Sequence, residues 1–286
     1  MRIGVASGKG GTGKTTVATN LAFTASAAGR SVAYLDCDVE EPNGHLFLKP
    51  QVTSCKPVHR PVPRVDEEKC TYCGQCGEIC QYSAVVCLGQ KILVFPEMCH
   101  GCGGCHLVCP EDAIVEVPRE IGLLETGRAG AIQFVQGVLK VGEAMSPPLI
   151  RAVKAAAPDA DLIIADAPPG TSCSVIESVR DSDFVLLVTE PTPFGLNDLK
   201  LAVGMTRALK LPFGVVLNRA GLGDQEVYLY CRWEHIRILA EIPDDRRVAE
   251  SYSRGELICE ALPEFAESFA GLLQEVTNDV TPLART

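Results

Sequence analysis

Eight of the fourteen cysteines in this chain of 286 residues fall into two runs with the same spacing, C-x-x-C-x-x-C-x-x-x-C. The first run is Cys70, Cys73, Cys76 and Cys80, and the second is Cys99, Cys102, Cys105 and Cys109. Thiolates are good ligands for soft metal centres, and closely spaced cysteines can converge from one tight loop. The repeat therefore predicts a metal-binding segment, with disulfides as the less favoured alternative.

This spacing is typical of small domains that hold two [4Fe–4S] clusters. The first three cysteines of a run bind one cluster, and the fourth cannot reach it and binds the other. We therefore expect one cluster on Cys70, Cys73, Cys76 and Cys109, and a second on Cys99, Cys102, Cys105 and Cys80. Zinc is the alternative metal, although zinc sites normally pair two C-x-x-C units.

The two runs differ in the residue that follows them. Pro110 follows the second run, whereas Gln81 stands at the matching position of the first. Exposure and hydrogen bonding change the potential of a cluster, so the two clusters are expected to differ. The nearby Cys55 and Cys87 are interpreted as packing residues rather than ligands, because free cysteine buries well.

A second set of residues has the composition of a phosphate-binding loop. Residues 8–16 read GKGGTGKTT, which fits G-x-x-x-x-G-K-[ST] between an apolar segment, 2–7, and a helical one, 17–28. Lys14 is expected to reach the β- and γ-phosphates of ATP, and the Thr15 hydroxyl to ligate Mg²⁺. The nucleotide-binding residues of this loop would be Gly8, Gly10, Gly11, Thr12, Gly13, Lys14, Thr15 and Thr16.

Acidic residues follow two apolar segments that read as buried strands. Asp36 and Asp38 follow residues 31–35, and Asp166 ends the segment 162–166, with Gly170 just beyond it. The carboxyl ends of parallel strands are where α/β sheets bind ligands. Asp166 fits the carboxylate that holds Mg²⁺ through water, and Gly170 fits a backbone N–H that senses the γ-phosphate. Asp36 is expected to support Mg²⁺ through water.

Lys9, a second lysine directly after the first glycine, makes the loop resemble that of the MinD/ParA/Mrp ATPases, a group that includes the nitrogenase iron protein. The resemblance implies an ATP-sandwich dimer, of identical or related subunits, in which Lys9 touches the partner's ATP. It also implies that Asp38 positions the attacking water, that Asn218 reads the adenine edge, and that the loop at Pro243 lines the adenine.

Cys173 lies three residues past Gly170. In the nitrogenase iron protein a cysteine just after this switch ligates a cluster at the dimer interface, but the spacing here is longer. An interfacial cluster and a redox or packing role both stay open for Cys173.

Apolar segments alternate with helical ones on both sides of the cysteine runs. This order predicts an α/β fold with a mostly parallel sheet flanked by helices. The alternation stops between residues 56 and 118, where Pro57, Pro61 and Pro63 suggest an extended linker, and short strands are expected at 84–88 and 114–117. We therefore expect a discontinuous ATPase domain, 1–55 and 119–286, and an inserted small α+β ferredoxin-like domain, 56–118.

The remaining sequence features argue against several functions. The net charge of −10 disfavours nucleic acid as a partner. No apolar stretch approaches the length of a membrane span, the start lacks the apolar core of a signal peptide, and the last helical segment, 264–276, carries Glu264, Glu267 and Glu275. The expectation is a cytoplasmic protein without membrane contact.

The resemblance implies an ATPase, and the cysteine runs add a redox role. The main hypothesis is ATP-gated electron transfer through two [4Fe–4S] clusters to a protein partner that accepts electrons or a cluster. One alternative is an iron–sulfur cluster carrier of the Mrp type. Such carriers use a C-x-x-C in the C-terminal half, whereas Cys231 and Cys259 stand alone here. The other alternative is a MinD-like positional organiser.

Overall fold

The computed structural model describes residues 1–279, so the last seven residues of the expected ATPase domain, 280–286, lie outside it. The chain forms two compact units. Unit 1 contains Met1–Cys55, Leu124–Val138 and the chain from Ile150 onward, and unit 2 contains Lys56–Leu123 and Leu139–Leu149. Unit 2 thus extends past residue 118 and includes a second segment that the sequence-based division placed in the ATPase domain.

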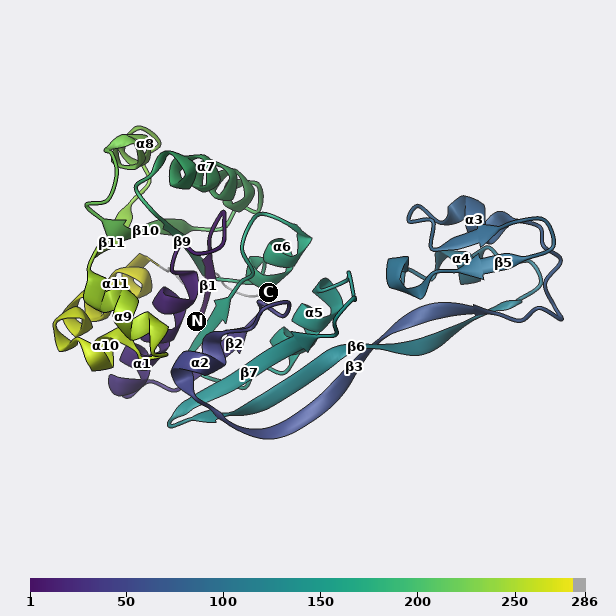
Figure 1. Ribbon diagram of the computed structural model, residues 1–286, viewed down its shortest axis with the longest axis horizontal. Coiled ribbons are helices and arrows are strands. Elements are labelled where there is room, and N and C mark those ends of the chain that lie inside the picture. Colours follow the sequence, from purple (N-terminus) through teal and green to yellow (C-terminus); the bar gives the residue numbers. More distant parts are fainter. Residues whose placement is uncertain (280–286) are drawn as a thin grey trace. The chain divides into compact units, whose positions relative to one another are not determined.

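A nine-stranded sheet runs in the order β11-β10-β9-β1-β8-β2-β7-β6-β3 (Figure 1). The strands from β11 to β7 pair in parallel. Their bounds are β1 Arg2–Ala6, β2 Val32–Asp36, β7 Ile132–Leu139, β8 Leu162–Asp166, β9 Phe184–Thr189, β10 Phe213–Ala220 and β11 Ile238–Pro243. The expected α/β class with a mostly parallel sheet is therefore confirmed.

The segment interpreted as a linker is instead part of a strand. Pro57, Pro61 and Pro63 lie in β3 (Gln51–Val65), which is the edge strand of the sheet. Proline has no N–H to donate, and an edge strand tolerates this on its unpaired side. A linker and an edge strand are both extended, so prolines alone could not separate them.

The strand β3 runs antiparallel to its neighbour β6 (Ile114–Ala129). The Thr53 hydroxyl donates to Thr126 O at 3.2 Å, and Asp66 N donates to Ala113 O at 2.7 Å. Residue numbers therefore increase along β3 in the direction in which they decrease along β6, which is the antiparallel arrangement. A tight turn at Gly130, with φ of 57°, joins β6 to β7, and so short a connection requires an antiparallel pair.

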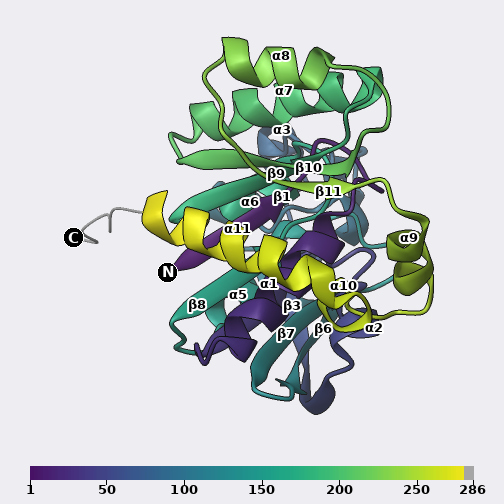
Figure 2. The same ribbon diagram turned by 90° about the vertical axis from the view of Figure 1, so that its left-hand side faces the viewer.

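Helices cover both faces of the parallel part of the sheet (Figure 2). On one face α1 packs beside α10 and α11, and on the other lie α6, α7 and α8. The helix bounds in unit 1 are α1 Lys14–Ala27, α2 Gly44–Leu48, α5 Pro147–Ala155 (assigned in part to each unit), α6 Cys173–Val179, α7 Pro193–Ala208, α8 Glu226–Trp233, α9 Arg246–Ser253, α10 Ile258–Ala261 and α11 Ala266–Asp279. None of the helices in residues 1–279 is long and apolar enough to cross a membrane.

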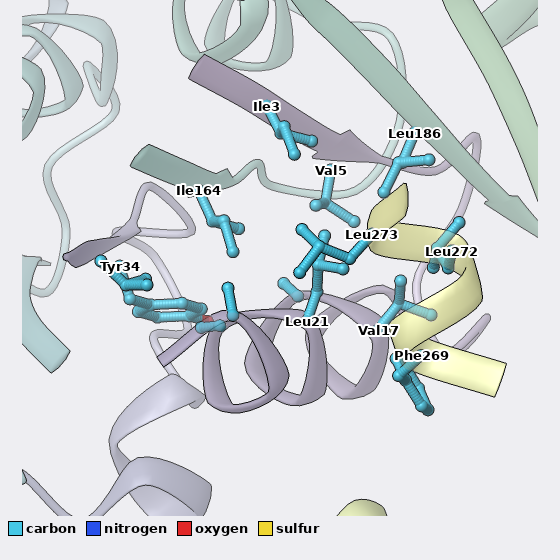
Figure 3. Packing of buried hydrophobic residues seen from close by; sticks show 14 of the residues in the cluster. Ile3, Val5, Val17, Leu21, Tyr34, Ile164, Leu186, Phe269, Leu272 and Leu273 are labelled. Atoms are coloured by element: carbon cyan, nitrogen blue, oxygen red, sulfur yellow. The ribbon is translucent and has the colours of Figure 1, made fainter. Parts of the chain in front are cut away.

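The main core lies between the sheet and the α1–α11 pair. Figure 3 shows Val17 and Leu21 of α1 meeting Phe269, Leu272 and Leu273 of α11 beneath Ile3, Val5, Ile164 and Leu186 of the sheet. Burial of each such side chain stabilises the fold by about 1.5–3 kcal/mol. The strand ends that carry functional residues are therefore fixed by a close-packed core.

Unit 2 repeats one backbone pattern for the two cysteine runs. Each run contains a glycine with positive φ (Gly74, 83°; Gly103, 74°) that directly precedes a short helix, α3 (Gln75–Ile79) or α4 (Gly104–Leu107). A residue with positive φ then follows each run, Ser83 at 52° and Asp112 at 48°. The chain continues into β4 (Val85–Cys87), which pairs with β5 (Ile92–Val94), or into β6. The short strand expected at 84–88 is present as β4, whereas the one expected at 114–117 is wrong in length, because it is the beginning of the 16-residue strand β6.

Candidate functional site

The loop between β1 and α1 lines a cavity of about 140 Å³ at the carboxyl end of β1. The loop residues that line it are Lys9, Gly10, Gly11, Gly13, Lys14, Thr15 and Thr16. Of the loop residues expected to bind nucleotide, Gly8 and Thr12 stand back from the cavity. A Cβ at Gly8 would lie 2.2 Å from Asp198 O, so this glycine allows the loop to approach α7.

Lys14 forms a buried ion pair with the aspartate at the end of β8. Its Nζ lies 2.5 Å from Asp166 Oδ1, and the Tyr34 hydroxyl donates to Asp166 Oδ2 at 2.9 Å. Burial lowers the pKa of Lys14, but the charges of Asp166, Asp38 and Asp36 outweigh it, so the pKa is raised overall. Lys14 is therefore held in its charged form, as phosphate binding requires.

Two more carboxylates end β2 beside this pair. Burial and then the charge of Asp166 raise the pKa of Asp36 to about 8, although its carboxylate accepts hydrogen bonds from Gly44 N at 2.9 Å and Asp38 N at 3.2 Å. Burial raises the pKa of Asp38, which lines the cavity, to about 6. Three carboxylates face the single charge of Lys14.

This excess of negative charge fits Mg²⁺. The ion usually keeps several waters and binds proteins through one or two carboxylates plus substrate phosphates. Thr15 supplies a hydroxyl in the same cavity, and Asp166 supplies a buried carboxylate next to Lys14. These are the residues that the sequence assigns to the metal.

A second cavity, of about 320 Å³, adjoins the first and shares Gly11, Gly13, Thr16 and Tyr252 with it. Asn218 and Pro243, the two residues expected near adenine, both line it. The Asn218 amide donates to Thr12 O at 2.9 Å, which fixes the side chain against the phosphate loop. A Cβ at Gly13 would lie 2.2 Å from Asn218 Nδ2, so the two positions depend on each other.

Tyr252 lines both cavities and was not anticipated. It belongs to α9 (Arg246–Ser253), and its ring lies 5.0 Å from that of Phe47. A tyrosine in a surface helix carries no signal of its own in a single sequence. Its role follows only from the way α9 packs beside the phosphate loop.

Lys9 and Gly170 are engaged within their own chain. Lys9 Nζ lies 3.6 Å from Glu190 Oε2, and Arg219 Nη1 lies 3.3 Å from Glu190 Oε1. Gly170 N donates to Ser7 O at 2.9 Å, which ties the loop after β8 to the phosphate loop. The sequence did not single out Glu190, although it directly follows β9 at the same edge of the sheet.

The cysteines that the sequence assigns to the first cluster line one cavity in unit 2. They are Cys70, Cys73, Cys76 and Cys109. The cavity thus brings three cysteines of the first run together with the last cysteine of the second. Apolar side chains, among them Val65, Ile92 and Ile114, form much of the remaining wall.

The second set is less closely gathered. Cys99 packs with Cys80 against Val62 and Ala84, which again joins one run to the fourth cysteine of the other. Cys105 packs instead with Cys76 and Cys109 of the first set, and Cys102 is exposed. Within residues 1–279 no group of three or more His, Cys, Asp and Glu residues could hold a metal ion. A [4Fe–4S] cluster binds its four thiolates through four different irons, so its ligands lie farther apart than the ligands of a single metal ion.

Backbone N–H groups point at the fourth cysteine of each run. Ala84 N lies 3.3 Å from Cys80 Sγ, and Ala113 N lies 3.2 Å from Cys109 Sγ. Gly101 N donates similarly to Cys99 Sγ at 3.3 Å. Hydrogen bonds of this kind favour the thiolate form that iron requires. The donor set thus fits an iron–sulfur cluster in each half.

The other cysteines lie elsewhere. Cys87 Sγ is 3.5 Å from Tyr72 O, and Cys173 is the exposed first residue of α6. Cys55 is exposed on β3, so the packing role expected for it is wrong. Cys231 and Cys259 are both buried, in separate hydrophobic clusters.

Comparisons with known proteins agree with this nucleotide site. The CobQ/CobB/MinD/ParA nucleotide binding domain matches residues 3–258. Two uncharacterized proteins of Methanocaldococcus jannaschii are 31% and 32% identical to this chain, over 90% and 96% of both partners. An Aquifex aeolicus protein named iron-sulfur cluster carrier protein is 26% identical over 97% of this chain and 67% of its own length.

Among solved structures, the septum site-determining protein MinD of Pyrococcus horikoshii, complexed with Mg-ADP, has a TM-score of 0.59 and 21% identity, with 96% of this chain and 95% of that one covered. MinD of Pyrococcus furiosus gives 0.58 and 23%, with 97% and 98% covered. These likenesses show a shared fold. Together with the domain match and the phosphate loop, they make this chain a member of the CobQ/CobB/MinD/ParA family of P-loop nucleotide-binding ATPases.

Proposed function

We propose that this protein is an ATP-dependent iron–sulfur protein: unit 1 binds and hydrolyses Mg-ATP, and unit 2 holds two [4Fe–4S] clusters. The observation that carries the proposal is the single cavity lined by Cys70, Cys73, Cys76 and Cys109. Three cysteines from one run and the fourth from the other meet there, as two-cluster binding requires.

The nucleotide site supplies the groups for phosphoryl transfer. Lys14 would bind the β- and γ-phosphates, and Thr15 and Asp166 would hold Mg²⁺, which would supply charge neutralisation at the phosphates. Asp38 orients the attacking water. Its raised pKa, about 6, leaves it largely ionised at neutral pH and able to accept a proton from that water. Asn218 offers a donor and an acceptor to the adenine edge.

Cluster carriage is the activity that the comparisons favour. Proteins named iron-sulfur cluster carrier proteins, from Aquifex aeolicus, Methanocaldococcus jannaschii and Pyrococcus horikoshii, are 24–26% identical over 96–97% of this chain. In this role ATP binding or hydrolysis would trigger release of a cluster to an acceptor protein. Cys231 and Cys259 are buried and give no surface pair to hold it, so the cluster would come from unit 2.

ATP-gated electron transfer is the second candidate, and the packing of the cysteines favours it. Cys76 and Cys99 are buried, and the cavity of the first set is mostly apolar. A cluster with a buried ligand is harder to release, whereas Cys73 and Cys102, which are exposed, would leave one side of each cluster open to electron exchange with a redox partner.

One experiment separates the two activities. The protein is reconstituted with ⁵⁵Fe and sulfide and mixed with an apo-ferredoxin, with or without Mg-ATP. Carriage predicts that ⁵⁵Fe moves to the acceptor faster with ATP, and that Lys14→Gln abolishes the ATP effect. Electron transfer predicts that iron stays in place while ATP speeds oxidation of the dithionite-reduced protein. If the protein binds no clusters, both activities are refuted.

A further inference from the structure

A buried arginine lies in unit 2 near the second cysteine run. Arg60, on β3, is 2% exposed, and its Nη2 donates to Glu143 Oε1 at 2.6 Å and to Pro96 O at 2.8 Å. Its other two nitrogens, Nε and Nη1, are buried and have no hydrogen-bond partner among the described residues. Buried guanidinium groups normally satisfy their donors, so two free N–H-bearing atoms need an explanation.

Several contacts place Arg60 beside the second run. The same carbonyl oxygen, Pro96 O, also accepts a hydrogen bond from Cys99 N at 3.2 Å. Arg60 Nη2 and Cys99 N are therefore both hydrogen-bonded to one oxygen atom. Val62 is two positions along β3 and therefore on the same face of the strand, and it packs against Cys99 and Cys80.

The first set of cysteines has no such neighbour. Its cavity is lined by apolar residues and by Glu111, and no lysine or arginine is among the described residues that line it. The two halves of the repeat share a backbone pattern but differ in the nearest cation. Glu143 offsets the charge of Arg60 but leaves the unused N–H donors of the guanidinium in place.

We propose that Arg60 is a tuning residue, whose unpartnered Nε and Nη1 donate to the sulfur atoms of the cluster on Cys99, Cys102, Cys105 and Cys80 and raise its reduction potential above that of the other cluster. When this cluster takes up one electron its negative charge grows, and N–H donors and a nearby cation stabilise the reduced form. An electron from an external one-electron donor therefore settles on the second cluster. The proposal rests on the proposed iron–sulfur function.

The test is an EPR-monitored redox titration of the reconstituted full-length protein. The wild type gives two one-electron steps, and Cys73→Ser and Cys102→Ser identify them, because each alters a ligand of one cluster. Arg60→Gln is expected to lower the reduction potential of the step assigned to the second cluster by at least about 59 mV, which corresponds to a tenfold change in the equilibrium constant of a one-electron reduction. Arg60→Lys, which keeps the charge but not the fork of donors, should fall between. Arg64→Gln, a change at an exposed arginine of the same strand, should move neither step.

Arg60→Gln leaves the buried Glu143 with Arg119 as its remaining partner, so Arg60→Gln/Glu143→Gln provides a second variant in which neither charge of the Arg60–Glu143 pair remains. The proposal is overturned if both variants leave the two potentials in place, or if the shift falls on the step that Cys73→Ser identifies. Those outcomes differ from failure of the iron–sulfur function itself, in which the wild type would show no cluster signals and both proposals would fall.

Discussion

Lys14 Nζ and Asp166 Oδ1 lie 2.5 Å apart although 152 positions separate the two residues in the chain. Lys14 begins α1 and Asp166 ends β8, and the parallel pairing of β1 with β8 brings both to the same edge of the sheet. Both side chains are buried, at 7% and 0% exposure. The lysine proposed to bind phosphate and the aspartate proposed to hold the metal thus form one electrostatic unit.

Replacing Lys14 with Gln should weaken both binding and folding. Loss of the charged donor should lower ATP affinity at least about 100-fold, and the unpaired Asp166 should reduce the free energy of unfolding by about 3–5 kcal/mol. Isothermal titration and urea unfolding measure the two effects. Lys210→Gln, at an exposed lysine, is the control and should change neither. Full ATP binding by Lys14→Gln would contradict the role given to this lysine.

Lys9→Gln should act on assembly rather than on binding by one chain. Lys9 is 34% exposed and 3.6 Å from Glu190, and an ion pair of this kind contributes at most about 1 kcal/mol, so Lys9 can leave it for a partner's phosphates at little cost. We expect ATP-induced dimerisation to be lost while ATP binding is kept. Analytical ultracentrifugation with ATP, in an Asp38→Asn background that slows hydrolysis, measures this. An unchanged dimer would remove Lys9 from the interface.

The acidic cluster predicts how stability depends on pH in EDTA without nucleotide. The pKa of Asp36 is raised from an ordinary 3.8 to about 8, and that of Asp38 from 3.8 to about 6. Between the ordinary and the raised pKa of each residue, the folded protein therefore binds more protons than the unfolded chain. The free energy of unfolding should therefore fall as pH rises from 5 to 8.5, by at most about 1.4 kcal/mol per pH unit for each proton involved.

Thermal or urea unfolding across this pH range tests the slope. Asp38→Asn should reduce the decrease in the free energy of unfolding that occurs up to about pH 6, the range in which Asp38 titrates. Saturating Mg-ATP should flatten the whole curve, because the ion compensates the carboxylates. A stability that rises steadily from pH 5 to 8.5 would contradict the raised pKa values.

Paired cysteine variants test the crosswise ligation. Cys109 lines the cavity of the first set, so Cys73→Ser/Cys109→Ser should damage one cluster and Cys102→Ser/Cys109→Ser should damage both. Iron content and the EPR spectrum of the reduced protein report the number of intact clusters. Cys55→Ser, at an exposed cysteine outside both runs, is the control. If the two double variants gave the reverse pattern, each run would hold its own cluster.

Asn218→Ala should change nucleotide choice. Asn218 lines the larger cavity and is fixed by its hydrogen bond to Thr12 O, so its loss removes the amide expected to read adenine. We expect ATP affinity to fall about tenfold, the effect of one or two hydrogen bonds, and ATP to lose much of its advantage over GTP. Competition binding with the two nucleotides measures this. Asn197→Ala, at an exposed asparagine on α7, should bind both as the wild type does.

Much of the frame could be predicted because its signals are local. The segment 162–166 is an unbroken apolar run that ends in Asp166, and it forms β8 with those bounds. The glycine spacing in residues 8–16 and the cysteine spacing in the two runs likewise predict which residues can bind the same phosphate group or the same cluster. The reason is that the backbone limits how far a short loop can reach.

Other features depend on contacts between distant segments, and only the tertiary structure decides them. Prolines in residues 57–63 fit a linker as well as an edge strand, and the pairing of β3 with β6 settles the matter. Tyr252 joins the nucleotide site because α9 packs beside the phosphate loop, and Glu190 meets Lys9 because β9 lies next to β1.

The same division holds for the cysteine runs. Their spacing by itself predicts that a fourth thiol comes from the other run, since the chain between Cys76 and Cys80 is too short to return to the same cluster. The spacing says nothing about what lies beside each cluster. Arg60 reaches the second run through a strand that precedes both runs, and its burial against Glu143 depends on a segment that follows them. The number of residues between successive cysteines limits which of them can bind one cluster, whereas the packing of distant segments decides the electrostatic environment of the site.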